Sequence, residues 1–285
     1  MIDFVAIGLR ALAFAAVLQA AGVPLFLWLF AAHLDRAAKP IGTLAVHSAI
    51  AGVVLTLGQA AVEPARLAGE FRGILDPALH GILLSSAAGT TVAIRLLGLA
   101  MIAAGCIRYS RFGAAAALIG STLIVASFAF MGHTASDDNR WLLAVLLIIH
   151  LLIIAFWFGA LWPLLLATRC ETAAKIGAII EQFSQLAIWL VPMLFIAGLA
   201  LAITLLPSSA SLLTPYGMLL LSKITAFGIL LGLASLNKWR FARRIGGGDT
   251  AALRALQRSV TTEWLLIVGV VSVTAVMTGL FAPGH

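Results

Sequence analysis

The sequence predicts an all-α, polytopic transmembrane helical bundle with about eight spans. Composition is the first reason, because 62% of the 285 residues are hydrophobic and only 10% are charged, whereas soluble domains carry roughly 25% charged residues. The second reason is that apolar runs of span length, roughly 20 residues, recur along the chain. The third is that Lys and Arg gather in the loops on one side of these runs, as they do in membrane proteins.

Each apolar run predicts a helix, because backbone groups cannot be hydrated in hydrocarbon and must pair within the segment. The first run is too long for a cleaved signal peptide, so we expect it to be retained. Pro24 and Pro163 are expected kink points. We expect one integral membrane domain over 1–285, with four spans in 1–135 and four in 136–285. The predicted spans are 4–32, 41–62, 88–107, 113–132, 141–167, 184–206, 217–236 and 261–281.

The distribution of positive charge predicts the orientation. The loops after the first, third, fifth and seventh spans hold twelve Lys and Arg residues, and the other side holds six, including Arg95 and Lys223 inside span ends. The richer side is expected in the cytoplasm, which puts both termini in the periplasm or outside the cell. The outer segment 63–90 is expected to contain a short interfacial helix. Because the net charge of +7 resides mainly in cytoplasmic loops, the expected partner is the lipid bilayer and not nucleic acid.

Ionisable groups inside spans are costly and therefore informative about function. His150 follows Arg140 by ten residues, which places it roughly 15 Å along a helix and near the middle of a bilayer core of about 30 Å. Trp157 lies two turns later on the same face. Two readings of His150 stay open: a neutral histidine bonded to a neighbouring helix, and a metal ligand or proton relay.

A second candidate site lies at the outer end of the fourth span, where Met131 and His133 are separated by a glycine. Imidazole binds copper, and a thioether favours Cu(I). His47 lies nearer the cytoplasm in the second span. It could join His150 as a second copper station or as one of a pair of axial haem ligands, or it could make a helix-packing hydrogen bond.

Lys223 and Glu263 are expected near opposite ends of the seventh and eighth spans, so we predict no direct ion pair between them. Glu263 is expected to open a helix, where the macrodipole favours an acid, and to pair with Arg258 or another loop arginine. Lys223 is expected to extend toward the outer surface. The sequence contains no recognisable nucleophile motif, paired catalytic carboxylates or nucleotide-binding motif, so we expect no enzyme.

The region 131–166 resembles the copper resistance protein D (CopD/PcoD) family of inner-membrane proteins. The resemblance rests on His133 at a span end and on His150 followed by Trp157 and Gly159. Later elements of the same pattern are Lys223 after a Pro-Tyr-Gly turn, Asn237 with basic neighbours, and Glu263.

This resemblance implies a multi-pass inner-membrane protein of copper homeostasis. It suggests that copper, with Cu(I) and import favoured, is captured by His133 and Met131 and passed to His150, with His47 farther inward. Trp157, Lys223 and Glu263 would support that route, and a periplasmic copper-binding protein would be a partner. The His150 to Gly159 pattern also resembles HemJ-type proteins. That alternative implies bound haem b and an oxidoreductase acting on protoporphyrinogen.

Overall fold

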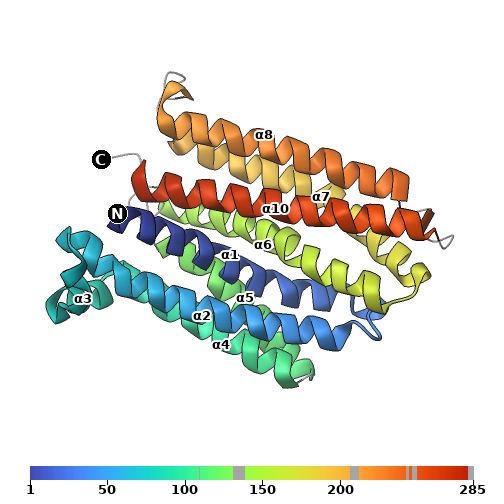
Figure 1. Cartoon of the computed structure of the whole chain (residues 1–285), viewed down its shortest axis with the longest axis horizontal. Helices are drawn as coiled ribbons and strands as arrows, with labels where there is room; N and C mark the ends of the chain where they lie inside the picture. Colours follow the sequence, from blue (N-terminus) through green and yellow to red (C-terminus); the bar gives the residue numbers. More distant parts are fainter. Residues whose placement is uncertain (109, 131–138, 206–211, 242–243, 246–248, 282–285) are drawn as a thin grey trace.

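The computed structural model describes residues 1–108, 110–130, 139–205, 212–241, 244–245 and 249–281. Within these residues, eight helices are long and apolar enough to cross a membrane. They run roughly parallel to one another, and the start of the first helix lies at the same end of the bundle as the end of the last helix (Figure 1). The predicted all-α helical bundle with eight spans is therefore confirmed. Which end faces the cytoplasm remains a prediction from the positive charges.

The first half of the chain contains four of the long helices, and a short helix lies at the end of the bundle where the first helix begins. The short helix α3 lies within the outer segment where one was expected, and its N-terminus is capped by Asp76, whose carboxylate accepts from the backbone N–H of Ala78. Gly69, with φ of 73°, ends α2 in the left-handed conformation. The elements are α1 (Ile2–Leu29), η1 (Ala31–His33), α2 (Ala38–Ala68), η2 (Phe71–Leu75), α3 (Pro77–Ser85), α4 (Ala87–Arg108), α5 (Arg111–Ser127) and η3 (Phe128–Phe130).

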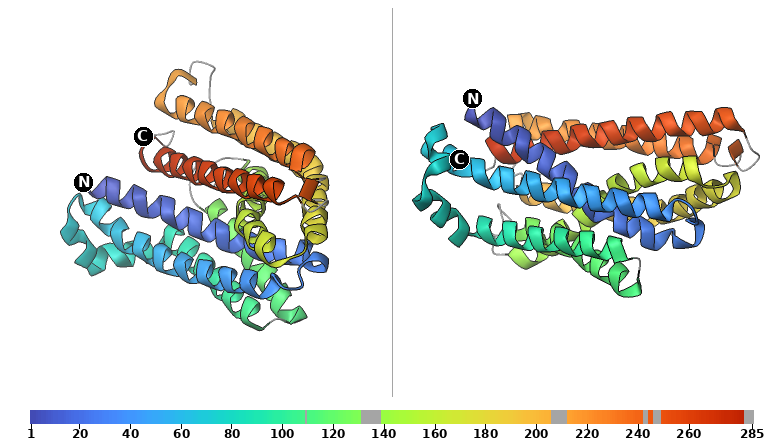
Figure 2. Two further views of the ribbon diagram at one scale, coloured as in Figure 1. Left: turned by 45° about the vertical axis from the view of Figure 1, so that its right-hand side comes forward. Right: turned by 60° about the horizontal axis from the view of Figure 1, so that its bottom comes forward.

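The second half supplies the other four long helices, with a π-helical turn directly after α8. In Figure 1 and in the left view of Figure 2, α8 lies at one edge of the bundle and α4 at the opposite edge. Helix α10 packs against α1, α6 and α8. The elements are α6 (Arg140–Cys170), α7 (Ala173–Leu205), α8 (Pro215–Leu236), η6 (Asn237–Phe241) and α10 (Thr250–Leu280).

Glycines allow the closest helix contacts. A Cβ atom at Gly22 of α1 would overlap the backbone carbonyl of Ala155 in α6, and one at Gly159 would overlap the backbone of Gly22. Helices α4 and α5 meet in the same way at Gly98 and Gly120. Small residues let helix backbones approach in a membrane, where packing and not the hydrophobic effect holds helices together.

Gln19 connects α1 to two helices of the second half. Pro163 has no N–H, so the carbonyl of Gly159 four residues earlier lacks its intrahelical donor. Gln19 Nε2 donates to that carbonyl at 3.3 Å, and Gln19 Oε1 accepts from Trp264 Nε1 at 3.4 Å. The buried glutamine thereby satisfies a carbonyl that the proline leaves without its helical partner.

At the predicted cytoplasmic end, side chains of the second half form hydrogen bonds with backbone groups at the helix ends of the first half. Glu171 Oε1 accepts from the backbone N–H groups of Arg36 and Ala37 at 2.7 and 2.8 Å, just before α2 begins. Gln182 Nε2 donates to the carbonyl of Leu29 at the end of α1. These bonds fix the connection between α1 and α2 against the end of α6 and against α7.

Two predicted spans begin too late. Helix α7 begins at Ala173 instead of 184, and α10 begins at Thr250 instead of 261. In α10 the added turns bury Ala252, Leu256 and Val260 at intervals of four residues, while basic residues occupy the other faces. A hydropathy average misses such a stripe, although the helical spacing of apolar residues reveals it.

Candidate functional site

His150 lies on α6 and faces α7. Its Nδ1 is 3.3 Å from the backbone carbonyl of Leu194. Gly198, one turn later on α7, lies beside the ring, because a Cβ at that position would be 2.9 Å from His150 Cε1. The absence of a side chain at Gly198 therefore makes room for the imidazole. If Nδ1 carries the proton that this carbonyl accepts, the lone pair resides on Nε2, as in many histidine ligands of metals.

Lys223 of α8 lies near enough to act electrostatically on His150. Its side chain also lines an apolar cavity of about 400 Å³ between α8 and α10, with Thr262, Leu266 and Gly269. The side chain of Lys223 therefore borders the space between α8 and α10, and its charge acts on His150 from there.

Trp157 lies two turns along α6 from His150, and only 5% of its surface is exposed. Its ring meets Phe183 of α7 edge to face, with centroids 5.8 Å apart, and Phe183 stacks on Phe156 at 5.5 Å. These aromatic contacts fix the indole between α6 and α7. Trp157 also interacts with Glu263, although its Nε1 does not reach hydrogen-bond geometry.

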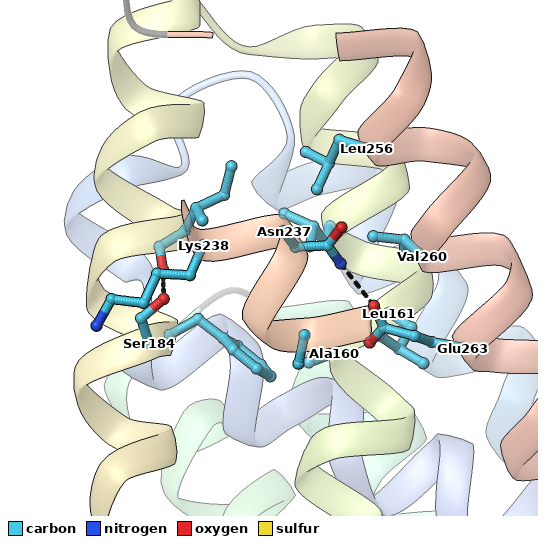
Figure 3. A pocket seen from close by; sticks show the side chains of 12 residues that line it. Ala160, Leu161, Ser184, Asn237, Lys238, Leu256, Val260 and Glu263 are labelled. Atoms are coloured by element: carbon cyan, nitrogen blue, oxygen red, sulfur yellow. Dashed lines mark hydrogen bonds between the residues drawn. The ribbon is translucent and has the colours of Figure 1, made fainter. Parts of the chain in front are cut away.

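Glu263 lies at the centre of a second polar group, nearer the predicted cytoplasmic end. Its Oε1 accepts a 2.6 Å hydrogen bond from Asn237 Nδ2, and the two residues are only 3% and 7% exposed. Figure 3 shows the two side chains directed toward one another from α10 and η6, beside a cavity of about 40 Å³. Ser184 of α7 and Lys238 of η6 also line this cavity.

The expectation that Glu263 opens a helix is wrong, because α10 begins at Thr250, more than three turns earlier. The macrodipole argument for an acid therefore fails at this position. Its hydrogen-bond partner also differs from the expected arginine and is Asn237 of η6. The sequence analysis named Asn237 only as part of the family pattern and not as a site residue, although a polar amide directly after an apolar span was a usable signal.

Of the other candidate ligands, His47 lies in the part of the chain that the structure describes. His47 is exposed on α2, while His150 faces α7. Met131 and His133 lie outside the described residues. Within the part of the chain that the structure describes, no three His, Cys, Asp or Glu residues form a group that could hold a metal ion.

The haem alternative finds no matching cavity among those described above. Neither the 400 Å³ cavity at Lys223 nor the 40 Å³ cavity at Glu263 is lined by a histidine. A haem needs an axial ligand such as His beside its binding cavity. The residues lining these two cavities therefore do not fit haem.

Arg95 is a further buried charge whose environment the sequence did not reveal. It was counted with the outer loops, but the residue is only 5% exposed on α4. Its Nε donates to Ser127 Oγ at 3.3 Å, and its guanidinium lies 4.4 Å from the centre of the Phe128 ring. Phe14 of α1 contacts the same ring edge to face. The cation–π contact partly replaces the hydration that Arg95 gives up.

Comparison with known proteins covers most of the chain. A sequence model described as copper resistance protein D matches residues 177–277. A second, described as the N-terminal domain of copper resistance protein D-like proteins, matches residues 1–140. The chain belongs to the copper resistance protein D family. Glu263, Asn237 and Lys223 lie within the first match, whereas His150 and Trp157 lie between the two.

A curated relative carries the same family name. Copper resistance protein D of Pseudomonas syringae pv. tomato is 30% identical over 183 residues, which are 54% of this chain. The match spans 56% of that relative's length. No solved structure matches the sequence.

Proposed function

We propose that this member of the copper resistance protein D family moves copper across the inner membrane, with His150 as an intramembrane ligand. The observation that carries the proposal is the placement of His150. Its imidazole lies against the small surface of Gly198, near the Leu194 carbonyl, in a helix long enough to span the bilayer. Ionisable side chains inside a membrane are costly, so a histidine at that depth more often has a function than not.

The remainder of the route follows from the chemistry of the candidate ligands. Copper, preferably as Cu(I), is captured at the outer end by His133 and Met131, since a thioether and an imidazole suit that ion. It then passes inward to His150, and His47 is a weaker station farther along. A periplasmic copper-binding protein would deliver the ion. Import is the favoured direction, and the chain acts as a transporter instead of an enzyme.

The decisive experiment measures metal flux with the full chain in proteoliposomes. A copper chelator is sealed inside, and copper or zinc is added outside under reducing conditions, with protein orientation determined by protease accessibility. We expect copper accumulation above that of protein-free vesicles and little zinc accumulation. Equal copper uptake with and without the protein would overturn the proposal.

An absorption spectrum of the purified protein separates copper transport from the haem alternative. A protein that handles copper alone has no Soret band as isolated. A stoichiometric Soret band would instead support the HemJ-like reading, with His150 as its first candidate axial ligand.

A further inference from the structure

The pairing of Glu263 with Asn237 differs from an ordinary helix-packing hydrogen bond because it borders an internal cavity. Asn237 Oδ1 is buried without a hydrogen-bond partner, while Asn237 Nδ2 serves Glu263. The adjoining cavity measures about 40 Å³, and a single water needs roughly 10–15 Å³ by that measure. There is therefore room for water beside a carboxylate that bulk solvent scarcely reaches.

The asparagine amide can serve both protonation states of Glu263. Its Nδ2 donates to the carboxylate oxygen in the arrangement observed. If the amide turns over, Oδ1 can accept a hydrogen bond from a protonated carboxyl. A partner that only donates, such as arginine, would favour the ionised form alone. An amide partner thus permits a proton to bind and leave without loss of the hydrogen bond.

The cavity opens beside a distorted part of the backbone. Asn237 is the first residue of η6, a π-helical turn that continues α8, and such turns often occur at functional sites. Lys238 supplies the other charged side chain of the cavity lining, while Ser184 from α7 and Leu161 from α6 are neutral. The cavity therefore lies at the end of α8 that the charge distribution assigns to the cytoplasm.

We propose that Glu263 is a proton-binding site that exchanges protons with cytoplasmic water through this cavity. A hydronium ion in the cavity transfers its proton to a carboxylate oxygen, which forms an O–H bond and leaves a neutral water. The reverse transfer returns the proton to water. This step rests on the proposed function and makes the proton the counter-ion: Glu263 takes it from cytoplasmic water through this cavity and releases it toward the outer side as copper enters through His150.

A bound metal cation fits the same cavity less well than a proton. Hard cations such as Ca²⁺ take about six to eight oxygen ligands, whereas the side-chain oxygens lining this cavity come from Glu263, Asn237 and Ser184. A purely structural pair is also less apt, because a buried carboxylate carries a desolvation cost that an amide would avoid.

Infrared titration of the full chain in lipid nanodiscs tests the proton site without any copper. The C=O stretch of a protonated carboxyl is followed as pH is lowered, for the wild type, Glu263→Gln and Glu181→Gln. Glu181 is a matched control because it is an exposed acid on α7. Among the bands of the protein's carboxyls, we expect one that Glu263→Gln removes and Glu181→Gln retains. Identical spectra for the wild type and a folded Glu263→Gln would overturn the proposal.

Asn237→Leu provides a second variant if Glu263→Gln does not fold. Removal of the amide should shift the midpoint of the Glu263 band by about one pH unit, a roughly tenfold change in proton concentration. A purely structural pair would change the stability without producing a titrating band. A band that responds to Na⁺ at constant pH, and not to pH, would identify a metal-cation site and overturn the proton assignment.

The link to copper is tested separately with a pH dye sealed inside the vesicles of the flux assay. Copper entry into wild-type vesicles should alkalinise the lumen, because protons leave as copper enters. Glu263→Gln should bind copper but lose at least nine-tenths of that proton movement, a roughly tenfold effect. Copper entry with no change in luminal pH would overturn the exchange. If the wild type moves no copper, the transport proposal fails, while the infrared titration still decides the proton site.

Discussion

Helices α1 and α8 are both apolar enough to span a membrane, yet they are buried to very different extents. In the most apolar 18-residue window of α1, 56% of the residues are buried, compared with 6% in α8. Helix α1 contacts helices of both halves of the chain, while α8 packs against α10 and η6. The difference shows that hydropathy reports entry into the bilayer and says little about what a helix contacts there.

The same contrast appears in the glycines. Gly22 in α1 is required for a close helix contact, whereas a Cβ atom at Gly228 or Gly232 in α8 would meet no other atom within 4 Å. The candidate residues His150 and Glu263 belong to helices that border the sparsely buried α7 and α8. A route that must open and close requires elements of low local stability. We therefore interpret α1 as the fixed centre and α8 as the adjustable edge.

The largest effect is expected from adding one methyl group at the centre of the bundle. In Gly22→Ala the new Cβ would overlap the Ala155 carbonyl, and a backbone atom cannot move aside as a side chain can. We expect destabilisation of about 1–3 kcal/mol or more, measured as a lower midpoint of thermal unfolding in detergent. Gly228→Ala is the matched control and should change little or stabilise slightly, since alanine favours helix. Equal losses in both variants would contradict the contrast between α1 and α8.

The next effect concerns transport and leaves folding intact. His150→Ala should lower copper flux at least roughly tenfold. Removing a residue that merely supports a metal ligand already costs about that much in metal affinity or activity. His47→Ala should have a smaller effect, because that residue is exposed on α2. Both variants should elute as the wild type does in size-exclusion chromatography. Undiminished flux in a well-folded His150→Ala would remove His150 from the copper route.

A smaller loss is expected when the connection between the two halves is cut. In Gln19→Leu, the Gly159 carbonyl and the Trp264 N–H both lose a buried partner, which should cost about 1–3 kcal/mol. Gln185→Leu is the control, because that glutamine is exposed on α7 and bonds to Glu181. Thermal unfolding of the two variants in the same detergent measures the difference. Similar midpoints would show that α1 does not depend on this connection.

The spans could be predicted because hydrophobicity is a property of each segment by itself. The start of α10 could not be read from hydropathy, because its first turns bury Ala252 and Leu256 among polar residues. The helix could have been extended by following the four-residue spacing, a signal present in the sequence.

The candidate site depends on which helices meet, and a single sequence contains little of that information. His150 could be identified from its depth, but its position beside Gly198 depends on the packing of α6 against α7. Glu263 could be flagged as a charge within a span, yet its partner Asn237 is 26 positions away on another element. Helix-end arguments gave Glu263 the wrong partner because they consider only neighbours along the chain.

The smallest effect tests the adjustable edge at its cytoplasmic connection. Three groups hold the pKa of Asp249 below its ordinary value of 3.8: first the backbone N–H of Ala252, then that of Ala251, then Arg244. The Asp249 side chain is partly exposed. Because folding lowers this pKa, the ionised Asp249 carboxylate stabilises the N-terminus of α10 at pH values above the ordinary pKa of 3.8. This stabilisation is lost as the pH falls through the lowered pKa of the folded state. Asp249→Ala should therefore unfold at a slightly lower temperature than the wild type at neutral pH, and the difference should shrink below pH of about 4.

Because α10 holds α8 through their mutual packing, amide hydrogen exchange in α8 should rise in this variant while exchange in α1 stays unchanged. Equal increases in both helices would mean that α1 and α8 form one cooperative unit, and the distinction between centre and edge would then fail.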